Sequence, residues 1–157
     1  MRDPLAHLLT WTTYGTWLSG DARGSFAKSG KFVEPDPRRT RVAKARMTES
    51  PVRLTPEMRT LCDATIRRVA EHRGWTLLAT AVRSNHVHVV IRVDRAPAQA
   101  IADLKAWCTR DLKAACDAAR RQWWTERGSV RHLFDEQAVD DAVRYVLEAQ
   151  DRKDRDR

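Results

Sequence analysis

Two short apolar segments, residues 75–82 and 86–93, follow each other with only Arg83, Ser84 and Asn85 between them. The second segment is rich in β-branched residues, which are typical of strands. A gap of three residues between two such segments indicates a β-hairpin. Because the strands of a hairpin are antiparallel neighbours in one sheet, this pair fixes the centre of the fold.

Amphipathic helices are predicted on both sides of the hairpin. Thr55 suits the N-cap of the earlier helix, Pro56 its first position and Gly74 its C-terminal cap. Its predicted buried stripe, with apolar residues three or four apart, consists of Met58, Leu61, Cys62, Thr65 and Val69. The later helix begins at Pro97, and its predicted buried stripe consists of Ile101, Leu104, Cys108, Leu112, Ala115 and Ala119.

Strands are also predicted near both ends of the chain, over residues 7–14 and 128–134, and a last helix over residues 136–150. In the first strand, Leu9 and Trp11 point to one face and Leu8 to the other. The order of elements is β-α-β-β-α-β with one added helix. This order predicts a single antiparallel sheet with helices on one face.

The charge of the chain is concentrated in one stretch. The chain has 157 residues, of which 29 are basic and 21 acidic, a net charge of +8. Residues 21–46 hold eight basic and three acidic residues, so they contribute +5 of this excess. The stretch has no periodicity, and Pro35 and Pro37 are expected to keep it extended. It is either a disordered insertion or a ligand-binding loop. Its charge favours a loop that binds phosphates, held by Arg23, Lys28, Lys31, Arg38, Arg39 and Arg41.

The length fits one domain. We expect residues 1–150 to form it, with residues 21–50 as a basic insertion loop and residues 151–157 as a charged tail. The three cysteines include no CxxC motif, which indicates a reducing, cytoplasmic setting. The first ten residues lack the apolar run of a signal peptide, and no run approaches the roughly 20 apolar residues of a membrane helix.

The motif His86-Val87-His88 opens the second strand of the hairpin. Alternate residues of a strand point to the same face, so both imidazoles project together while Val87 and Val89 project into the opposite layer. Two ligands on one rigid strand make half of a metal site. The alternative is that two histidines happen to lie on a polar face of the sheet.

Tyr145 is one of only two tyrosines, the other being Tyr14. It lies off the predicted apolar stripe of the last helix, which consists of Val139, Val143, Val146 and Leu147. Periodicity alone favours an ordinary surface residue over one that faces another element. A tyrosine hydroxyl has a pKa near 10, but a nearby divalent cation would neutralise the phosphate that it attacks. Tyr145 and the histidine pair together therefore indicate a tyrosine that attacks phosphate beside a bound metal.

The metal site needs a third ligand. Glu148, three residues after Tyr145, lies on nearly the same side of the helix. Gln150 is the other candidate, since it could turn inward where the helix ends. Carboxylates suit magnesium, whereas imidazoles lean toward zinc, copper or nickel, so the spacing does not decide the metal.

The remaining aromatic and histidine residues have plainer interpretations. Trp123 and Trp124 stand in an arginine-rich segment and could stack on unpaired bases. Closing the core is the slightly favoured alternative for both. His7 is expected to be a polar strand residue, and His72 and His132 surface residues.

Three segments together resemble the small single-tyrosine HUH transposases, which include insertion-sequence enzymes and their relatives associated with repetitive extragenic palindromes. They are SNHVHVVIRV of the hairpin, AVRYVLEAQ of the last helix, and the opening HLLTWTTYGTWLSGD, which is similar to a subgroup of the family. The resemblance extends from about His7 to Gln150.

The resemblance implies an α+β, ferredoxin-like fold with a C-terminal tyrosine-bearing helix. It implies that His86 and His88 are ligands of Mg²⁺ or Mn²⁺. It further implies that Tyr145 is the nucleophile, forming a phosphotyrosine link to the 5′ side of the cut and leaving a free 3′ hydroxyl. The implied partners are single-stranded or hairpin DNA and a second copy of the chain, whose histidine pair the tyrosine helix could serve.

One position departs from the family pattern. Members often carry glutamine or asparagine four residues after the tyrosine, where this chain has Ala149, so Glu148 and Gln150 stay open as third ligands. We expect a metal-dependent DNA strand transferase. The alternative is a non-catalytic nucleic-acid-binding module on the same fold. A phosphoesterase with paired histidine motifs ranks last, because the sequence has no second such motif.

Overall fold

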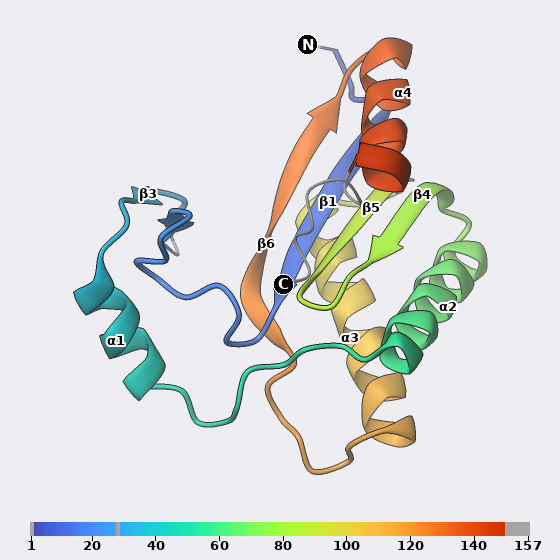
Figure 1. Ribbon diagram of the computed structural model, residues 1–157. Coiled ribbons are helices and arrows are strands. Elements are labelled where there is room, and N and C mark those ends of the chain that lie inside the picture. The colour runs from blue at the N-terminus through green and yellow to red at the C-terminus, as the bar shows by residue number, and fades with distance from the viewer. Residues whose placement is uncertain (1, 28, 150–157) are drawn as a thin grey trace.

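The computed structural model of the protein describes residues 2–27 and 29–149 (Figure 1). The strands are β1 (Ala6–Thr13), β2 (Ser25–Phe26), β3 (Phe32–Val33), β4 (Thr76–Val82), β5 (His86–Arg92) and β6 (Trp124–Leu133). The helices are α1 (Pro37–Ala45), α2 (Pro56–Arg73), α3 (Pro97–Ala115), α4 (Glu136–Arg144) and a π-helical turn that continues it, η1 (Tyr145–Ala149).

Four strands form one antiparallel sheet in the order β4-β5-β1-β6. The first strand, β1, lies between β5 and β6 and is antiparallel to both. β4 and β5 are the two strands of the predicted hairpin, and β4 forms one edge of the sheet. This strand order is the one expected for a β-α-β-β-α-β chain with a ferredoxin-like sheet, so the predicted fold class is confirmed.

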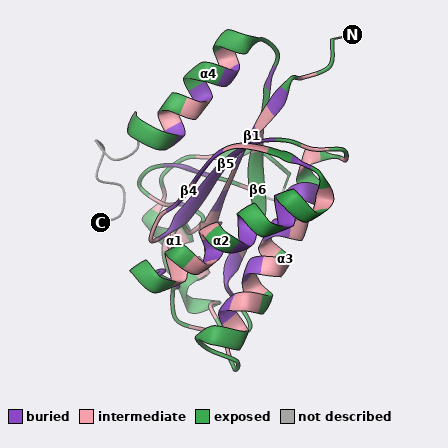
Figure 2. Cartoon of the chain, turned by 90° about the vertical axis from the view of Figure 1, so that its right-hand side faces the viewer, coloured by how far each residue is buried: buried purple, intermediate pink, exposed green. Residues whose placement is uncertain are grey.

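The prediction of helices on one face holds for α2 and α3 only. The added helix α4 lies on the other face, so helices cover both faces of the sheet (Figures 1 and 2). α2 and α3 pack on the face where Leu9, Val87 and Val89 are buried. α4 and η1 pack on the opposite face, against Leu8 and Val90. The alternating residues of β1 and β5 therefore divide between two apolar layers, as their period of two predicts.

The ends of α2 follow directly from the sequence. The Thr55 hydroxyl accepts a hydrogen bond from the backbone N–H of Met58, and Pro56 occupies the first helical position. Gly74 ends the helix in the left-handed conformation, with φ of +72°. These three predictions are confirmed. None of the helices within the described residues is both long enough and apolar enough to cross a membrane.

The end of α3 corrects a prediction. The helix stops at Ala115, which is exposed, and Ala119 lies beyond it, so neither belongs to the buried stripe. The cause is Asp117, whose carboxylate accepts hydrogen bonds from the backbone N–H groups of Ala119 and Arg120. Such a local bond replaces the helical ladder with a turn.

The last strand is longer than predicted, because β6 begins at Trp124 rather than at Gly128. Its pairing with β1 contains an irregularity between Trp11 and Thr13, which breaks the regular alternation of side chains between the two faces. Trp123 and Trp124 are both buried in the core beneath α3. Closing the core, the favoured interpretation of these two tryptophans, is thereby confirmed.

Residues 17–46, which we call the arm, are more ordered than predicted. They contain the β2–β3 hairpin and α1. Pro37 does not keep the chain extended; it opens α1, and the Asp36 carboxylate caps that helix by accepting a hydrogen bond from the N–H of Arg38. The prediction of an extended stretch without regular structure is therefore wrong.

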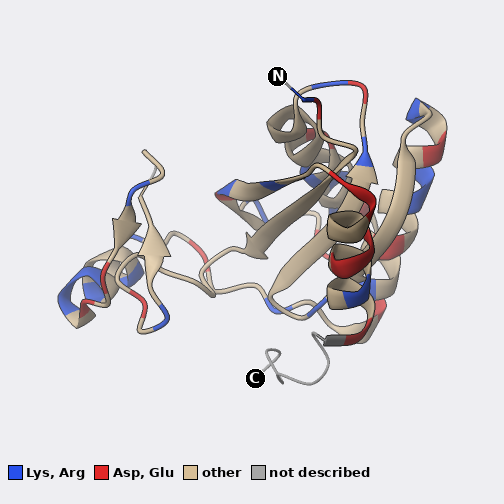
Figure 3. Ribbon diagram, turned by 90° about the horizontal axis from the view of Figure 1, so that it is seen from above, with Lys and Arg blue, Asp and Glu red and all other residues tan. Residues whose placement is uncertain are grey.

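The two ends of the arm meet the rest of the fold at Tyr14, just after β1. The N–H of Thr48, just after the arm, donates to the Tyr14 hydroxyl at 3.0 Å, and the N–H of Val52 donates to the Tyr14 carbonyl at 2.8 Å. In Figures 1 and 3 the arm stands to one side of the sheet, apart from α4. It is thus a side structure inserted between β1 and α2.

Candidate active site

The two histidines of the HVH motif lie side by side on β5. Their side chains are 8% and 6% exposed, and the ring centroids of His86 and His88 are 5.0 Å apart. Val87, between them, is fully buried in the opposite layer. The sequence prediction that both imidazoles project from one face is confirmed.

Each histidine ring is held through Nδ1. The N–H at Nδ1 of His86 donates to the Asn85 side-chain oxygen at 2.7 Å. Nδ1 of His88 is joined by a hydrogen bond of 2.7 Å to the hydroxyl of Thr10, its direct partner across β1 and β5. Such bonds fix the orientation of each ring, and a ring that donates from Nδ1 would bind a metal through Nε2.

Neither supporting residue was singled out from the sequence. Asn85 immediately precedes the motif, so its proximity is a local signal that could have found it. Thr10 lies two residues after Leu8, so alternation places it on the face that Leu8 occupies. Its pairing with His88 depends on the register between β1 and β5, which one sequence does not fix.

Tyr145 lies against the histidine pair. Its ring centroid is 5.7 Å from that of His88, with the two planes at 70°. The buried stripe of α4 and η1 packs over Val90, and His88 lies two residues earlier, on the same face of β5. Tyr145 lies beside the buried stripe of α4 and η1, so its side chain reaches His88. This contact explains why Tyr145 is half-buried although it is not part of the stripe.

Tyr145 is also the first residue of the π-helical turn. A π-turn closes with i→i+5 bonds, so it shifts the following residues relative to an ideal helical wheel. Such turns are frequent at functional sites. The contact of its ring with His88, and its partial burial, mean that Tyr145 is not the ordinary surface residue that periodicity favoured.

Among residues 2–27 and 29–149, no third metal ligand joins the histidine pair. The described residues contain no group of three His, Cys, Asp or Glu side chains that could hold a metal ion. Glu148 is exposed and forms no such group with His86 and His88. Gln150, the other candidate, lies outside the described residues. The two oriented imidazoles fit a divalent metal as two of its ligands.

The predicted phosphate-binding residues gather on the arm, and Figure 3 shows the basic side of α1. Arg23 is already engaged: it pairs with the Asp21 carboxylate at 2.7 Å, and its guanidinium lies 3.8 Å from the ring centroid of Trp17. The hydrogen bond from Arg23 holds the pKa of Asp21 below its ordinary value. Lys28 lies outside the described residues. The other predicted residues, Lys31, Arg38, Arg39 and Arg41, are exposed.

A second pair of histidines joins β1 to β6. The Nδ1 atoms of His7 and His132 are 3.0 Å apart, and their rings meet edge to face. Partial burial, assisted by the charge of His132, lowers the pKa of His7. The sequence predicts a polar strand residue at position 7 and a surface residue at position 132. Their contact depends on the register between β1 and β6, in which the two residues are direct partners.

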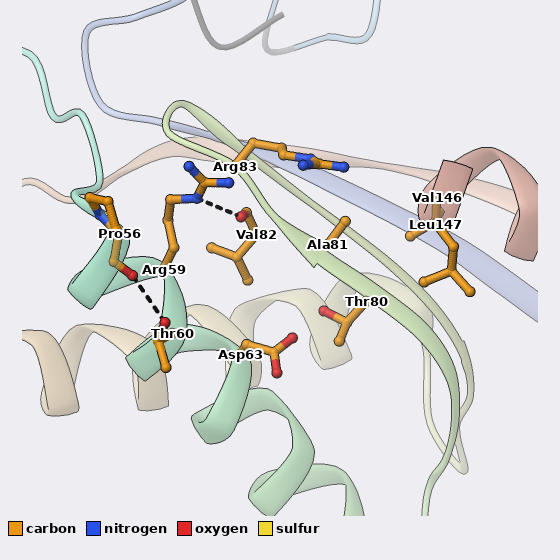
Figure 4. Close-up of a pocket in the computed structure, with 10 residues that line it drawn as sticks. All are labelled: Pro56, Arg59, Thr60, Asp63, Thr80, Ala81, Val82, Arg83, Val146 and Leu147. Carbon is orange, nitrogen blue, oxygen red and sulfur yellow. Dashed lines mark hydrogen bonds between the residues drawn. The ribbon is translucent and has the colours of Figure 1, made fainter. Parts of the chain in front are cut away.

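A pocket of about 500 Å³ opens at the β4 edge of the sheet, between the start of α2 and η1 (Figure 4). Arg59 crosses it, donating from Nε to the Val82 carbonyl at 3.0 Å. Ala81 lines the pocket and is the direct cross-strand partner of His88. The pocket therefore adjoins the face that carries the histidine pair.

The fold and the site together define an α+β protein with a histidine pair and a tyrosine on one face of a ferredoxin-like sheet. A sequence model described as "Transposase IS200 like" matches residues 43–148, more than half of the chain. The chain belongs to this family of IS200-like transposases. β1 and nearly all of the arm precede the matched residues.

Two transposases are among the solved structures that share the fold. A provisionally assigned transposase from Deinococcus radiodurans R1 is 14% identical, with a TM-score of 0.54 over 93% of this chain and 91% of the other. A REP-associated tyrosine transposase bound to a REP hairpin is 10% identical, with a TM-score of 0.57 over 98% of this chain and 70% of the other. No curated protein matches the chain.

Proposed function

We propose that this transposase cuts and rejoins single-stranded DNA, with Tyr145 as the nucleophile and a divalent metal held by His86 and His88. The observation that carries the proposal is the contact between the rings of Tyr145 and His88, which come from segments far apart in the sequence. A phenol and a pair of oriented imidazoles on one sheet face are the groups that such a reaction needs.

The proposed step is a transesterification, which keeps the energy of the broken phosphodiester bond in a new phosphotyrosine bond. The Tyr145 hydroxyl oxygen bonds to phosphorus while the bond from phosphorus to the 3′ oxygen breaks, and the phenol proton passes to the departing oxygen. The products are a 5′ phosphotyrosine and a free 3′ hydroxyl. Rejoining is the reverse, with a 3′ hydroxyl displacing the tyrosine, so no other energy source is required.

The residues around the site would orient the reactants. Asn85 and Thr10 hold the imidazoles of His86 and His88, and the packing of α4 on the sheet holds Tyr145 beside them. A bound Mg²⁺ or Mn²⁺ would neutralise the attacked phosphate and stabilise the charge that develops on it. Glu148 and Gln150 remain the candidates for a further ligand.

The proposed substrate is single-stranded or hairpin DNA. The family membership and the hairpin-bound relative support DNA as the partner. We further propose that the exposed basic residues of the arm hold the DNA phosphates. A homodimer stays a prediction. In this chain Tyr145 lies against His88 of the same subunit, which supports a site made within one copy.

A non-catalytic DNA-binding module is the second candidate, favoured by the lack of a three-ligand group among the described residues. Labelled single strands from the genomic flanks of the gene, incubated with Mg²⁺ or Mn²⁺ and run on a denaturing gel, separate the two. We expect a protein-linked band that disappears with EDTA and with Tyr145→Phe. Tyr14→Phe is the matched control and should keep the band. Binding without a band under every metal would favour the non-catalytic module.

A further inference from the structure

We propose that Phe26 and Phe32, on the β2–β3 hairpin of the arm, form a platform on which unpaired DNA bases stack, next to the phosphates held by α1. The proposal rests on the proposed function only for the identity of the nucleic acid. It concerns strand recognition rather than the chemistry at Tyr145.

The two rings are exposed although they are large and apolar. Phe26 is 72% exposed and Phe32 48%, and their centroids are 5.5 Å apart with the planes at 71°. Each strand of the hairpin has only two residues, too few to bury a ring of this size. Solvent-exposed aromatic rings that touch each other offer flat apolar surface to a ligand.

Contacts of Trp17, Arg23 and Gly24 fix the position of the Phe32 ring. The Trp17 indole N–H donates to the Gly24 carbonyl at 2.7 Å, and the guanidinium of Arg23 covers the Trp17 ring. Gly24 has φ of +84°, and a Cβ there would lie 2.7 Å from the ring of Phe32. The Phe32 ring therefore packs on bare backbone, which only glycine at position 24 allows. Phe26 is left as the outer ring.

The hairpin is tied to α1. The backbone N–H of Gly20 donates to the Ser25 hydroxyl at 2.9 Å, and the N–H of Asp36 donates to the Gly20 carbonyl at 2.8 Å. A Cβ on Gly20 would clash with the Asp36 carbonyl and with Cβ of Arg39. The aromatic rings and the basic helix thus belong to one structural unit.

The net positive charge of the arm indicates that the ligand of the aromatic rings is a polyanion. α1 buries no residue, so it is not there to complete the core. Its exposed basic residues include Arg38, Arg39 and Arg41, and the arm as a whole has eight basic and three acidic residues. Of the acidic residues, Asp21 is paired with Arg23 and Asp36 caps α1. An apolar partner would leave this excess of positive charge unmatched.

The aromatic rings narrow the choice to a strand with unpaired bases. A duplex hides the faces of its bases and offers this unit only phosphates, whereas every unpaired base has a face that can stack on an aromatic side chain. The arm lies almost entirely before the family-matched residues. It therefore supplies recognition that is additional to the matched part of the fold.

The test measures binding in the Tyr145→Phe background, so that the outcome does not depend on catalysis. Fluorescence anisotropy compares Phe26→Ala with its parent on a single-stranded oligonucleotide and on a blunt duplex of the same sequence. Loss of one stacked base predicts affinity weaker by about 5- to 100-fold for the single strand. Affinity for the duplex should change by less than about twofold, since the basic residues that bind phosphates are intact.

Two variants separate stacking from simple apolar contact and from damage to the arm. Phe26→Tyr should keep the single-strand affinity, and Phe26→Leu should lose most of it. Val42→Ala, at another exposed apolar position of the arm, should leave both affinities unchanged. Unchanged single-strand binding in Phe26→Ala, full binding in Phe26→Leu, or an equal loss on both DNA forms would overturn the proposal.

Discussion

The hydroxyl of Thr10 lies 2.7 Å from Nδ1 of His88, its cross-strand partner, while the ring of Tyr145 meets the same imidazole. His88 is thus held from one side by β1 and contacted from the other by the tyrosine helix. A residue that orients a metal ligand typically changes metal affinity or activity without itself touching the substrate.

Replacing Thr10 by valine should therefore lower metal affinity, or the yield of the covalent DNA complex, by about 10- to 100-fold. Valine keeps the β-branched shape, so the melting temperature should change little, and Thr10→Ser should restore activity. Thr12→Val is the control, because Thr12 bonds to Thr125 instead. Equal effects of the two valine variants on metal titration would contradict a positioning role for Thr10.

The packing of η1 should be needed to present Tyr145. Val146, the residue of η1 after Tyr145, is fully buried, and Val146→Ala should lower the free energy of unfolding by about 2 kcal/mol. Val69→Ala, on the opposite side of the sheet, should cost a similar amount. Urea denaturation gives the folded fraction of each variant, and a denaturing gel gives the yield of covalent DNA complex. Only Val146→Ala should reduce that yield per folded molecule. A matching loss in Val69→Ala would mean that stability alone limits activity.

The pair His7 and His132 should make stability depend on pH. The pKa of His7 is lowered in the folded protein, chiefly by burial, so the unfolded chain binds its proton more readily. Stability should consequently fall as the pH drops through the ordinary histidine pKa near 6.5 and be retained above it. Urea midpoints at pH 7.5 and 5.5 should differ less in His7→Gln than in the parent. An unchanged difference would show that other groups carry the dependence.

The arginines of α1 should contribute affinity without sequence preference. Combined Arg38→Gln, Arg39→Gln and Arg41→Gln changes should weaken binding to single strands and duplexes alike. The slope of log affinity against log salt should become shallower by about 0.7 to 0.9 for each phosphate that the variant no longer neutralises. Arg67→Gln with Arg110→Gln, on α2 and α3, is the control and should leave the slope unchanged. If the salt slope of the arm variant equals that of the parent, the arm does not contact the DNA phosphates.

Much of the framework could be predicted because its signals are local. The caps of α2 at Thr55 and Gly74, the hairpin, and the common face of His86 and His88 each depend on residues within a few positions. The family resemblance, carried by the same histidine motif and the late tyrosine, is confirmed by the match over residues 43–148.

The features of the fold and site that the sequence did not predict depend on contacts between segments far apart in the chain. The partner of Thr10 follows from strand register, and the contact of Tyr145 with His88 follows from the packing of α4 and η1 on the sheet, which a helical wheel does not contain. The sequence predicts an extended stretch in the arm because the order of the arm comes from contacts of Gly20, Gly24 and Asp36 rather than from apolar periodicity. The third metal ligand was left open by the sequence and is still a proposal.

The central claim is that Tyr145 is the residue that becomes joined to DNA. The most direct measurement is to trap the complex with a single-stranded oligonucleotide, digest both components, and identify the linked peptide by mass spectrometry. The account predicts one linked peptide, with the 5′ phosphate of the cut strand on Tyr145. A link at Tyr14, a 3′ linkage, or cleavage without any linked peptide would contradict it.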